Sequence, residues 1–346
     1  MKIKILPLII LSCILTIGFN ADAQTVKKAK LKFGGYGQKK FNDADKKIFI
    51  EQFNINYQYL YAKAKVKRGG RQLGGQSYIG DAKAALFLGL GNIDPQKLQE
   101  ITDKAYANFV DKLKSKGYQI LTGDDFKNHS HYKNDDVVTG GVPKEDLKGF
   151  ISTRPSNTTF INKGIGMFNT TLSTSKKLDG IIVARVNILV PFAEDGESQG
   201  SKAIGKMLGG IAKVVAKPNL RLAKSTSIQS KSKLGFDKHK LVMSTFDFGF
   251  KKNLKYQAWF TSAISKKGIE ISDVLPNKKY KAVKTGKVDM SGEHIGNGYK
   301  VFNVPTREAK VIQNIKFDAD KYFNGVLEGI NYYIGESTNK YLSKIK

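Results

Sequence analysis

Two histidines in an acidic stretch are the residues of this chain best suited to hold a metal. Residues 122–136 read TGDDFKNHSHYKNDD and place His129 and His131 among aspartates. Imidazole and carboxylate together suit a divalent transition metal, and an H-x-H pair converges when one strand face carries both rings. The stretch has no partner motif such as H-E-x-x-H, and aspartate and asparagine are common in solvent-exposed loops. A metal site at His129 and His131 is one hypothesis, and a plain polar loop is the other.

The sequence carries no other catalytic signature. It has no G-x-S-x-G motif and no glycine cluster of the phosphate-loop form G-x-x-x-x-G-K-[ST], and its acidic residues are scattered and not set as a pair that could divide into a catalytic acid and base. Cys13 is the only cysteine and lies in a segment that we expect to be removed, which excludes disulfides and cysteine nucleophiles from the mature chain. We therefore expect no cofactor and a function other than catalysis. The alternative from the enzyme class is a hydrolase with its site in residues 122–177.

Residues 201–217, SKAIGKMLGGIAKVVAK, carry the most informative binding pattern. On a helix, at about 100° per residue, their apolar and basic side chains separate onto opposite faces. The apolar face holds Ile204, Met207, Leu208, Ile211 and Val215, and the basic face holds Lys202, Lys206, Lys213 and Lys217. Such a helix is typical of segments that lie in the plane of an anionic membrane surface. A helix that packs its apolar stripe on the domain has the same pattern, so both interpretations stay open.

The charge of the chain indicates anionic partners. It has 58 basic and 30 acidic residues, a net charge of +28. We expect an anionic membrane surface or an acidic envelope polymer, and a protein partner or a second copy of the chain also stays open. Lysine greatly outnumbers arginine, which is the better reader of bases and phosphates, so specific nucleic-acid binding is not expected.

The N-terminus predicts export. Lys2 and Lys4 precede an apolar run over residues 5–19, and Ala21 and Ala23 have the small side chains of a signal-peptidase site. We predict that residues 1–23 are a signal peptide and that the protein is periplasmic, in the outer envelope or secreted. The alternative is a lipoprotein acylated at Cys13. No later stretch is apolar over the length, about 20 residues, that a membrane-spanning helix needs.

One segment, residues 94–121, shows most clearly how the body of the protein is organised. Asp94 can cap a helix with Pro95 in its first turn, and Gly117 can end it before a short strand. An apolar stripe at helical spacing predicts that one face is buried. The stripe consists of Leu98, Ile101, Ala105, Phe109 and Leu113.

Other elements follow from the alternation of apolar residues. We predict a long, half-exposed strand over residues 47–61, with Phe49 and Phe53 on its apolar side, and an inner strand over 178–192. A hairpin is expected over 240–250 and 254–264, and a closing helix over 318–338. Residues 122–177 are expected to be irregular. These elements predict an α+β fold with an antiparallel-rich sheet covered by helices on one face. Residues 24–346 would form one domain with a basic, helical insertion at about 194–236.

The order of these elements resembles a known envelope fold. A long strand, a helix ending in LKSKGYQIL, a strand of the type KLDGIIVARVNI, the hairpin KLVMSTFDFGFKKNLKYQAWF and a closing helix follow one another. This order is similar to that of the periplasmic α/β domain shared by the curli secretion channel family and the N-terminal domain of TolB. The resemblance implies a role in envelope assembly, secretion or binding without catalysis. The alternative is a secreted, membrane-active protein that uses residues 201–217.

Overall fold

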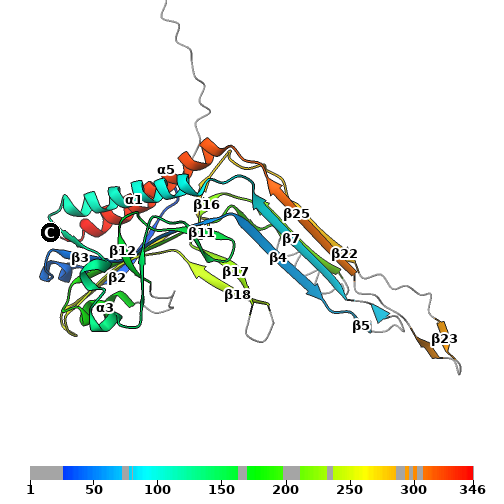
Figure 1. Ribbon diagram of the computed structural model, residues 1–346, viewed down its shortest axis with the longest axis horizontal. Helices are drawn as coiled ribbons and strands as arrows, with labels where there is room; N and C mark the ends of the chain where they lie inside the picture. Colours follow the sequence, from blue (N-terminus) through cyan, green and yellow to red (C-terminus); the bar gives the residue numbers. More distant parts are fainter. Residues whose placement is uncertain are drawn as a thin grey trace, which may run out of the picture.

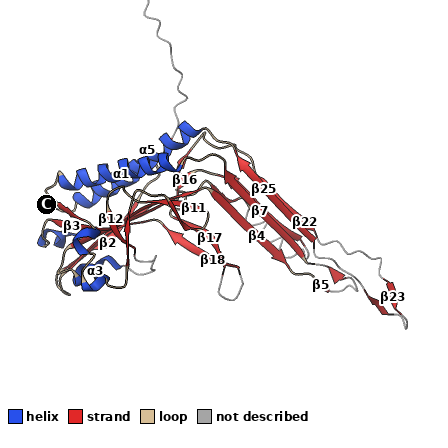
Figure 2. Cartoon of the chain, viewed as in Figure 1, coloured by secondary structure: helices blue, strands red, loops and turns tan. Residues whose placement is uncertain are grey.

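The computed structural model describes residues 26–71, 78–79, 81–162, 170–197, 211–231, 237–285, 293–295, 299–301 and 307–345. These residues form a body of sheet and helices, from which a long β-arm extends (Figure 1). Within the described residues, the helices belong to the body and the arm is made of strands (Figure 2). The predicted cleavage site and Cys13 lie outside the described residues.

The body is built on a mixed, mostly antiparallel sheet of eight described strands. Their order is β10, β11, β3, β13, β19, β20 and β2, and β8 also pairs with β3. Strands β13 and β8 run parallel to β3, and the other neighbours are antiparallel. Their bounds are β2 Lys32–Tyr36, β3 Lys47–Gln58, β8 Gln119–Leu121, β10 Lys144–Leu147, β11 Phe150–Thr153, β13 Ile182–Val190, β19 Thr245–Lys251 and β20 Gln257–Ala263. The predicted α+β class, the inner strand β13 and the hairpin β19–β20 are confirmed.

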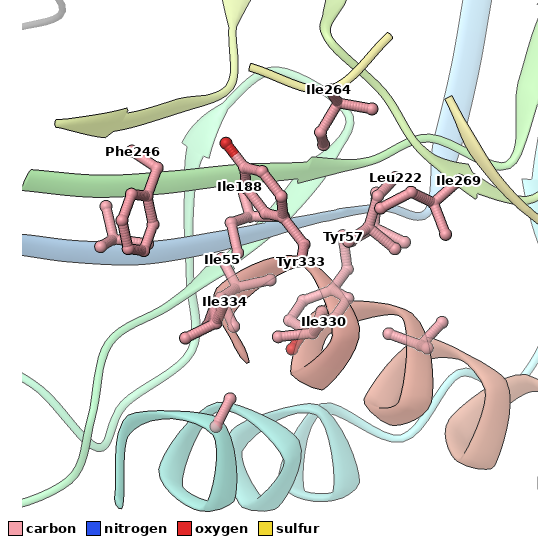
Figure 3. Close-up of a cluster of buried hydrophobic side chains, with 14 of the residues drawn as sticks. Ile55, Tyr57, Ile188, Leu222, Phe246, Ile264, Ile269, Ile330, Tyr333 and Ile334 are labelled. Atoms are coloured by element: carbon pink, nitrogen blue, oxygen red, sulfur yellow. The ribbon is translucent and has the colours of Figure 1, made fainter. Parts of the chain in front are cut away.

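Two long helices cover one face of this sheet. Helix α1, Pro95–Lys114, begins as predicted, because the Asp94 side chain accepts a hydrogen bond from the Gln96 N–H at 2.9 Å. All five residues of its predicted stripe are buried. Helix α5, Ala319–Leu342, begins at Asp318 in the same way and lies beside α1. The side chains of Ile330, Tyr333 and Ile334 point from α5 toward Ile55, Ile188 and Phe246 of the sheet (Figure 3).

A short helix covers the opposite face of the sheet, which the sequence did not indicate. Helix α3, Thr170–Lys177, packs on β19 and β13. Its Thr171 lies so close to Gly249 of β19 that a Cβ at that glycine would come within 2.4 Å of the threonine Oγ1. Glycine is therefore required where helix and strand meet.

Strand β3 is buried on both faces, so the prediction of a half-exposed strand is wrong. Asn56 and Gln58 are 3% and 5% exposed, because neighbouring strands and chain segments cover the polar side as well. The pairing with β13 skips Glu51, and this bulge reverses the alternation of side chains. Phe53 therefore points toward α1, whereas Phe49 joins a second cluster on the α3 side of the sheet.

The prediction that residues 122–177 are irregular is wrong, because the described part of this segment contains several short elements. Local hydrogen bonds build them; the first, for example, has a capping box between Thr122 and Asp125. Besides β10, β11 and α3, they are α2 Gly123–Phe126, the 3₁₀ turn η2 Ser130–Tyr132, β9 Asp136–Thr139 and β12 Thr159–Asn162. Strands β9 and β12 pair antiparallel.

The arm consists of two three-stranded sheets that pack face to face. One contains β25 Arg307–Ile315, β7 Ala82–Leu90 and β4 Leu60–Lys67 in this order. The other contains β14 Ala193–Asp195, β15 Ile211–Pro218 and β22 Tyr280–Thr285. Small side chains between the sheets let them approach closely. The buried inner residues are Ala82, Ala84, Leu86, Leu88, Ala212, Val214, Ala216 and Ala282.

The predicted helix at 201–217 is wrong for residues 211–217, which form strand β15. Ile211, Val214 and Val215 are β-branched, and the inward series Ala212, Val214 and Ala216 has the period of two that a strand requires. Pairing with β14 and β22 then satisfies the backbone of the strand on both sides. Lys202, Ile204, Lys206, Met207 and Leu208 lie outside the described residues.

The remaining elements connect the body and the arm or project from them. Strands β1 Val26–Lys27, β21 Ile269–Ile271 and β16 Arg221–Leu222 form a small sheet under α5. The turn η1 covers Gln38–Asp43. Three hairpins complete the described chain: β17 Ser225–Lys231 with β18 Asp237–Met243, β5 Gly70–Arg71 with β6 Tyr78–Ile79, and β23 Glu293–Ile295 with β24 Tyr299–Val301.

Candidate functional site

The outward surface of strands β15 and β22 brings four of the predicted membrane-binding residues together. Because side chains alternate along a strand, Ile211, Lys213, Val215 and Lys217 all point away from the core of the arm. Cross-strand pairing adds two residues of β22 to the same surface, Lys281 opposite Val215 and Val283 opposite Lys213. We call these six residues the lysine face. On it, basic and aliphatic side chains are interleaved and not separated as on the predicted helix.

The lysine face is accessible over most of its length. Lys281 is exposed and Val283 is 45% exposed, while Ile211, Lys213 and Lys217 are partly exposed. Val215 is the exception, because Gly196 lies against its side chain.

The opposite outer surface of the arm has the same character. Ile312 of β25 is 68% exposed, although it is a large aliphatic residue. Next to it, the Lys310 ammonium lies 5.7 Å from the centre of the Phe87 ring. Lys83 forms an ion pair with Glu308 at 3.1 Å.

The charge of the arm is strongly unbalanced. Strand β4 has three basic residues, β7 has one, and β15, β22 and β25 have two each, whereas Glu308 is the one acidic residue of these five strands. Acidic residues gather instead beside β4, where Lys63 pairs with Asp195 at 2.7 Å and Lys65 with Glu197 at 3.5 Å. These two ion pairs join the two sheets at one edge. On the lysine face, Glu194 of β14 lies opposite Lys217, so this surface combines three lysines with one glutamate and stays positive in balance.

The structure describes the two predicted metal ligands, and no third ligand joins them within the part of the chain that it describes. His129 is partly exposed at the start of η2, and its Nδ1 accepts a hydrogen bond from the backbone N–H of His131 at 3.2 Å. The His131 ring packs on Tyr132, with 4.8 Å between ring centres. Among the described residues, His, Cys, Asp and Glu form no group of three or more that could hold a metal ion. The metal hypothesis therefore rests on the two histidines alone.

A buried charged cluster lies between the sheet and α3. Arg185 of β13 donates from Nε to Glu51 of β3, a side chain that is fully buried. Tyr132 donates to the same carboxylate at 3.0 Å, and Asp247 is the cross-strand neighbour of Arg185. Burial, and next the charge of Glu51, raise the pKa of Tyr132, so the phenol stays a neutral donor.

Isolated charges in apolar runs are the sequence signal that could have indicated this cluster. Glu51, Arg185 and Asp247 are each a single charged residue inside an otherwise apolar or uncharged run: IFIEQF, IVARVNI and TFDFGF. A charge in such a position must find a buried partner or a solvated gap. The Glu51 carboxylate is fully buried and is held by Arg185 and Tyr132, so the geometry of the cluster indicates stabilisation of the fold.

The stability of the body should fall as Asp247 ionises. Burial raises the pKa of Asp247 above its ordinary value of 3.8, opposed by a hydrogen bond to Thr261 and by the charge of Arg185. The Asp247 carboxyl group therefore loses its proton less readily in the folded protein than in the unfolded one. As a result, the free energy of unfolding is highest below pH 3.8 and falls as the pH rises through the folded-state pKa. Asp247→Asn should therefore raise the melting temperature at neutral pH, and the gain should vanish below 3.8. Thermal denaturation of both proteins across this range tests it, and a lower melting temperature at neutral pH would contradict it.

A cavity at the junction of body and hairpin is too small for a substrate. It has a volume of about 30 Å³ and lies between β3, the loop before β11 and the hairpin β17–β18, where Gln58, Tyr61, Phe150 and Ile228 line it. Ligand pockets commonly have about 300–1,000 Å³, and a space of this size holds a water. The cavity therefore gives no support to the hydrolase alternative.

The chain has no match that would indicate its function. No protein-family model, curated protein or solved structure matches this chain. The likeness of its element order to the curli secretion channel and TolB domains stays an expectation. Among the described helices, none has the length and the apolar character needed to cross a membrane.

Proposed function

We propose that this chain is an exported protein of the cell envelope that acts by binding and assembly, not by catalysis, and that its arm contacts an anionic membrane surface. The observation that carries the proposal is the lysine face, where lysines alternate with aliphatic residues on an extended strand surface. The predicted signal peptide supports an envelope location.

A lipid surface suits this pattern better than a soluble acidic polymer. Lysine ammonium groups can reach anionic headgroups, while Val283 and Ile211 can enter the apolar part of the interface. A soluble polyanion would leave these aliphatic side chains without a partner. The proposal retains the membrane contact that the sequence predicts, and it replaces the helix with a strand surface.

The first test removes the charge of the lysine face. Each lysine near an anionic membrane surface contributes about 1 kcal/mol to binding, so replacing Lys213, Lys217 and Lys281 together by glutamine should weaken binding by about a hundredfold. Co-sedimentation with vesicles of phosphatidylglycerol and phosphatidylcholine measures the effect. The wild-type protein should bind anionic vesicles, lose binding as salt is raised and ignore purely zwitterionic vesicles.

A matched control removes equal charge from the body. Lys104, Lys114 and Lys144 are exposed residues of α1 and β10, and their replacement by glutamine should leave vesicle binding nearly unchanged. Equal losses in the two triple variants would show that binding follows net charge alone and would overturn the role of the arm. Binding to a soluble acidic polysaccharide, with none to vesicles, would overturn the choice of lipid.

A further inference from the structure

The strand at one end of the body sheet has an accessible edge. Among the described strands, β2 pairs with β20 on one side and ends the sheet on the other. Four of its five residues are exposed, and two of these are aromatic: Phe33 is 40% and Tyr36 is 46% exposed. An exposed edge strand is a template on which another extended chain can form backbone hydrogen bonds.

Aromatic rings lie on both sides of this edge. Phe33 stacks on Phe260 on the side of the sheet that α5 covers, with ring centres 6.2 Å apart. Tyr36 meets Trp259 edge-on at 6.2 Å on the α3 side. A strand added beside β2 would therefore have an exposed ring above it and another below it.

A side chain already bonds to the backbone at this edge. The Gln38 amide donates from Nε2 to the Gly34 carbonyl at 3.2 Å. A backbone N–H of an added strand could take over this bond, because a primary amide on a movable side chain is easily displaced. Glycine is required within β2 itself, because a Cβ at Gly35 would come within 2.0 Å of the Trp259 carbonyl oxygen of β20.

The positive charge around β2 favours an acidic partner. Residues 26–42 contain six lysines and no acidic residue. Lys27 pairs with Glu270, and Lys28 lies over the Tyr332 ring, but Lys30, Lys32 and Lys39 are exposed. Lys340 of α5 adds a further ammonium 5.8 Å from the Phe33 ring centre. A second copy of the chain would bring the same lysines and be repelled, whereas an acidic peptide would be attracted.

We propose that the edge of β2 binds an acidic, extended peptide segment of another protein, which adds as a strand to the body sheet. Backbone hydrogen bonds give such a complex its affinity, and side chains beside the strand give it selectivity. Here Phe33 and Tyr36 hold the two faces of the peptide, and the lysines bind its carboxylates. This inference concerns the body and does not depend on membrane contact by the arm.

The probe is a fluorescent synthetic peptide in which glutamate alternates with threonine and valine. Fluorescence anisotropy with the full-length mature protein should show saturable binding. Replacing Lys32, Lys39 and Lys30 together by glutamate should weaken binding about tenfold or more. Phe33→Ser with Tyr36→Ser should also weaken it, and melting curves should show that both variants stay folded.

A second peptide separates strand addition from attraction by charge. It has the same charge, but proline replaces every threonine, so that it cannot form a ladder of backbone hydrogen bonds. It should bind at least about tenfold more weakly than the first peptide. Equal binding of the two peptides would overturn the proposal in favour of a general polyanion site. No binding of either peptide would also overturn it, and the lysines would then only protect the edge from aggregation.

A variant of the arm tests whether peptide binding at β2 is independent of the lysine face. The variant with Lys213, Lys217 and Lys281 replaced by glutamine should bind the peptide like the wild-type protein. Parallel loss of peptide binding in this variant would contradict a site at β2. Failure of vesicle binding with intact peptide binding would reject the proposed role of the arm and leave this inference standing.

Discussion

Phe109→Asp should prevent the body from folding stably. Phe109 is fully buried on α1, and its ring lies 5.8–6.2 Å, centre to centre, from those of Phe53, Phe246 and Phe248. The substitution removes this packing and places a charge without a partner between the helix and the sheet. We expect a loss of more than about 4 kcal/mol in the free energy of unfolding. Circular dichroism and chemical denaturation measure it.

Two further variants show whether the buried position is the cause. Lys104→Asp makes the same side chain on the exposed side of α1 and should change the free energy of unfolding by less than about 0.5 kcal/mol. Phe109→Leu keeps an apolar side chain and should cost far less than Phe109→Asp. If Phe109→Asp unfolds at the same denaturant concentration as the parent, the account of the core is wrong.

Arg185→Met should cause the second largest loss of stability. It leaves Glu51 fully buried without its cationic partner and takes a positive charge away from Asp247. Breaking a buried ion pair in this way costs about 3–5 kcal/mol. Urea denaturation at neutral pH measures the loss.

A double variant identifies the source of this loss. Glu51→Gln removes the buried charge and keeps an oxygen that can accept from Tyr132. When Glu51→Gln is added to Arg185→Met, the free energy of unfolding should recover by about 1–3 kcal/mol. Arg221→Met is the matched control, because its partner Glu194, at 2.9 Å, is 36% exposed and can be solvated when the arginine is lost. No recovery in the double variant would mean that Arg185 acts by packing and not by pairing.

The two long helices could be predicted because their signals are local. Asp94, Pro95 and Gly117 mark the ends of α1 within one short segment, and Asp318 does the same for the start of α5. The apolar stripe of each of these helices keeps its helical spacing over most of the helix length. Such signals need no knowledge of the rest of the chain.

Features that depend on distant partners could not be predicted in this way. The bulge at Glu51 and the burial of Asn56 are set by β13 and β11, which pair with β3 from far along the chain. Whether residues 211–217 form a helix or a strand also depends on distant partners. Their apolar spacing fits a helix and a strand, and pairing with β22 decides between them.

The candidate site was predicted in composition but not in geometry. Lys213 and Lys217 were identified from the sequence, yet the face that they share with Lys281 exists only because β15 and β22 pair. The edge at β2 gave no signal of its own, since KFGGY looks like part of a lysine- and glycine-rich connection until its pairing with β20 is known.

The most direct test of the proposed function is a footprint of lysine reactivity on a membrane. The mature protein is acetylated briefly with and without phosphatidylglycerol vesicles, and mass spectrometry compares each lysine. If the arm contacts the membrane, vesicles should protect Lys213, Lys217 and Lys281 and leave Lys104, Lys114 and Lys144 as reactive as before. Protection of the body lysines with unchanged reactivity on the lysine face would contradict the account.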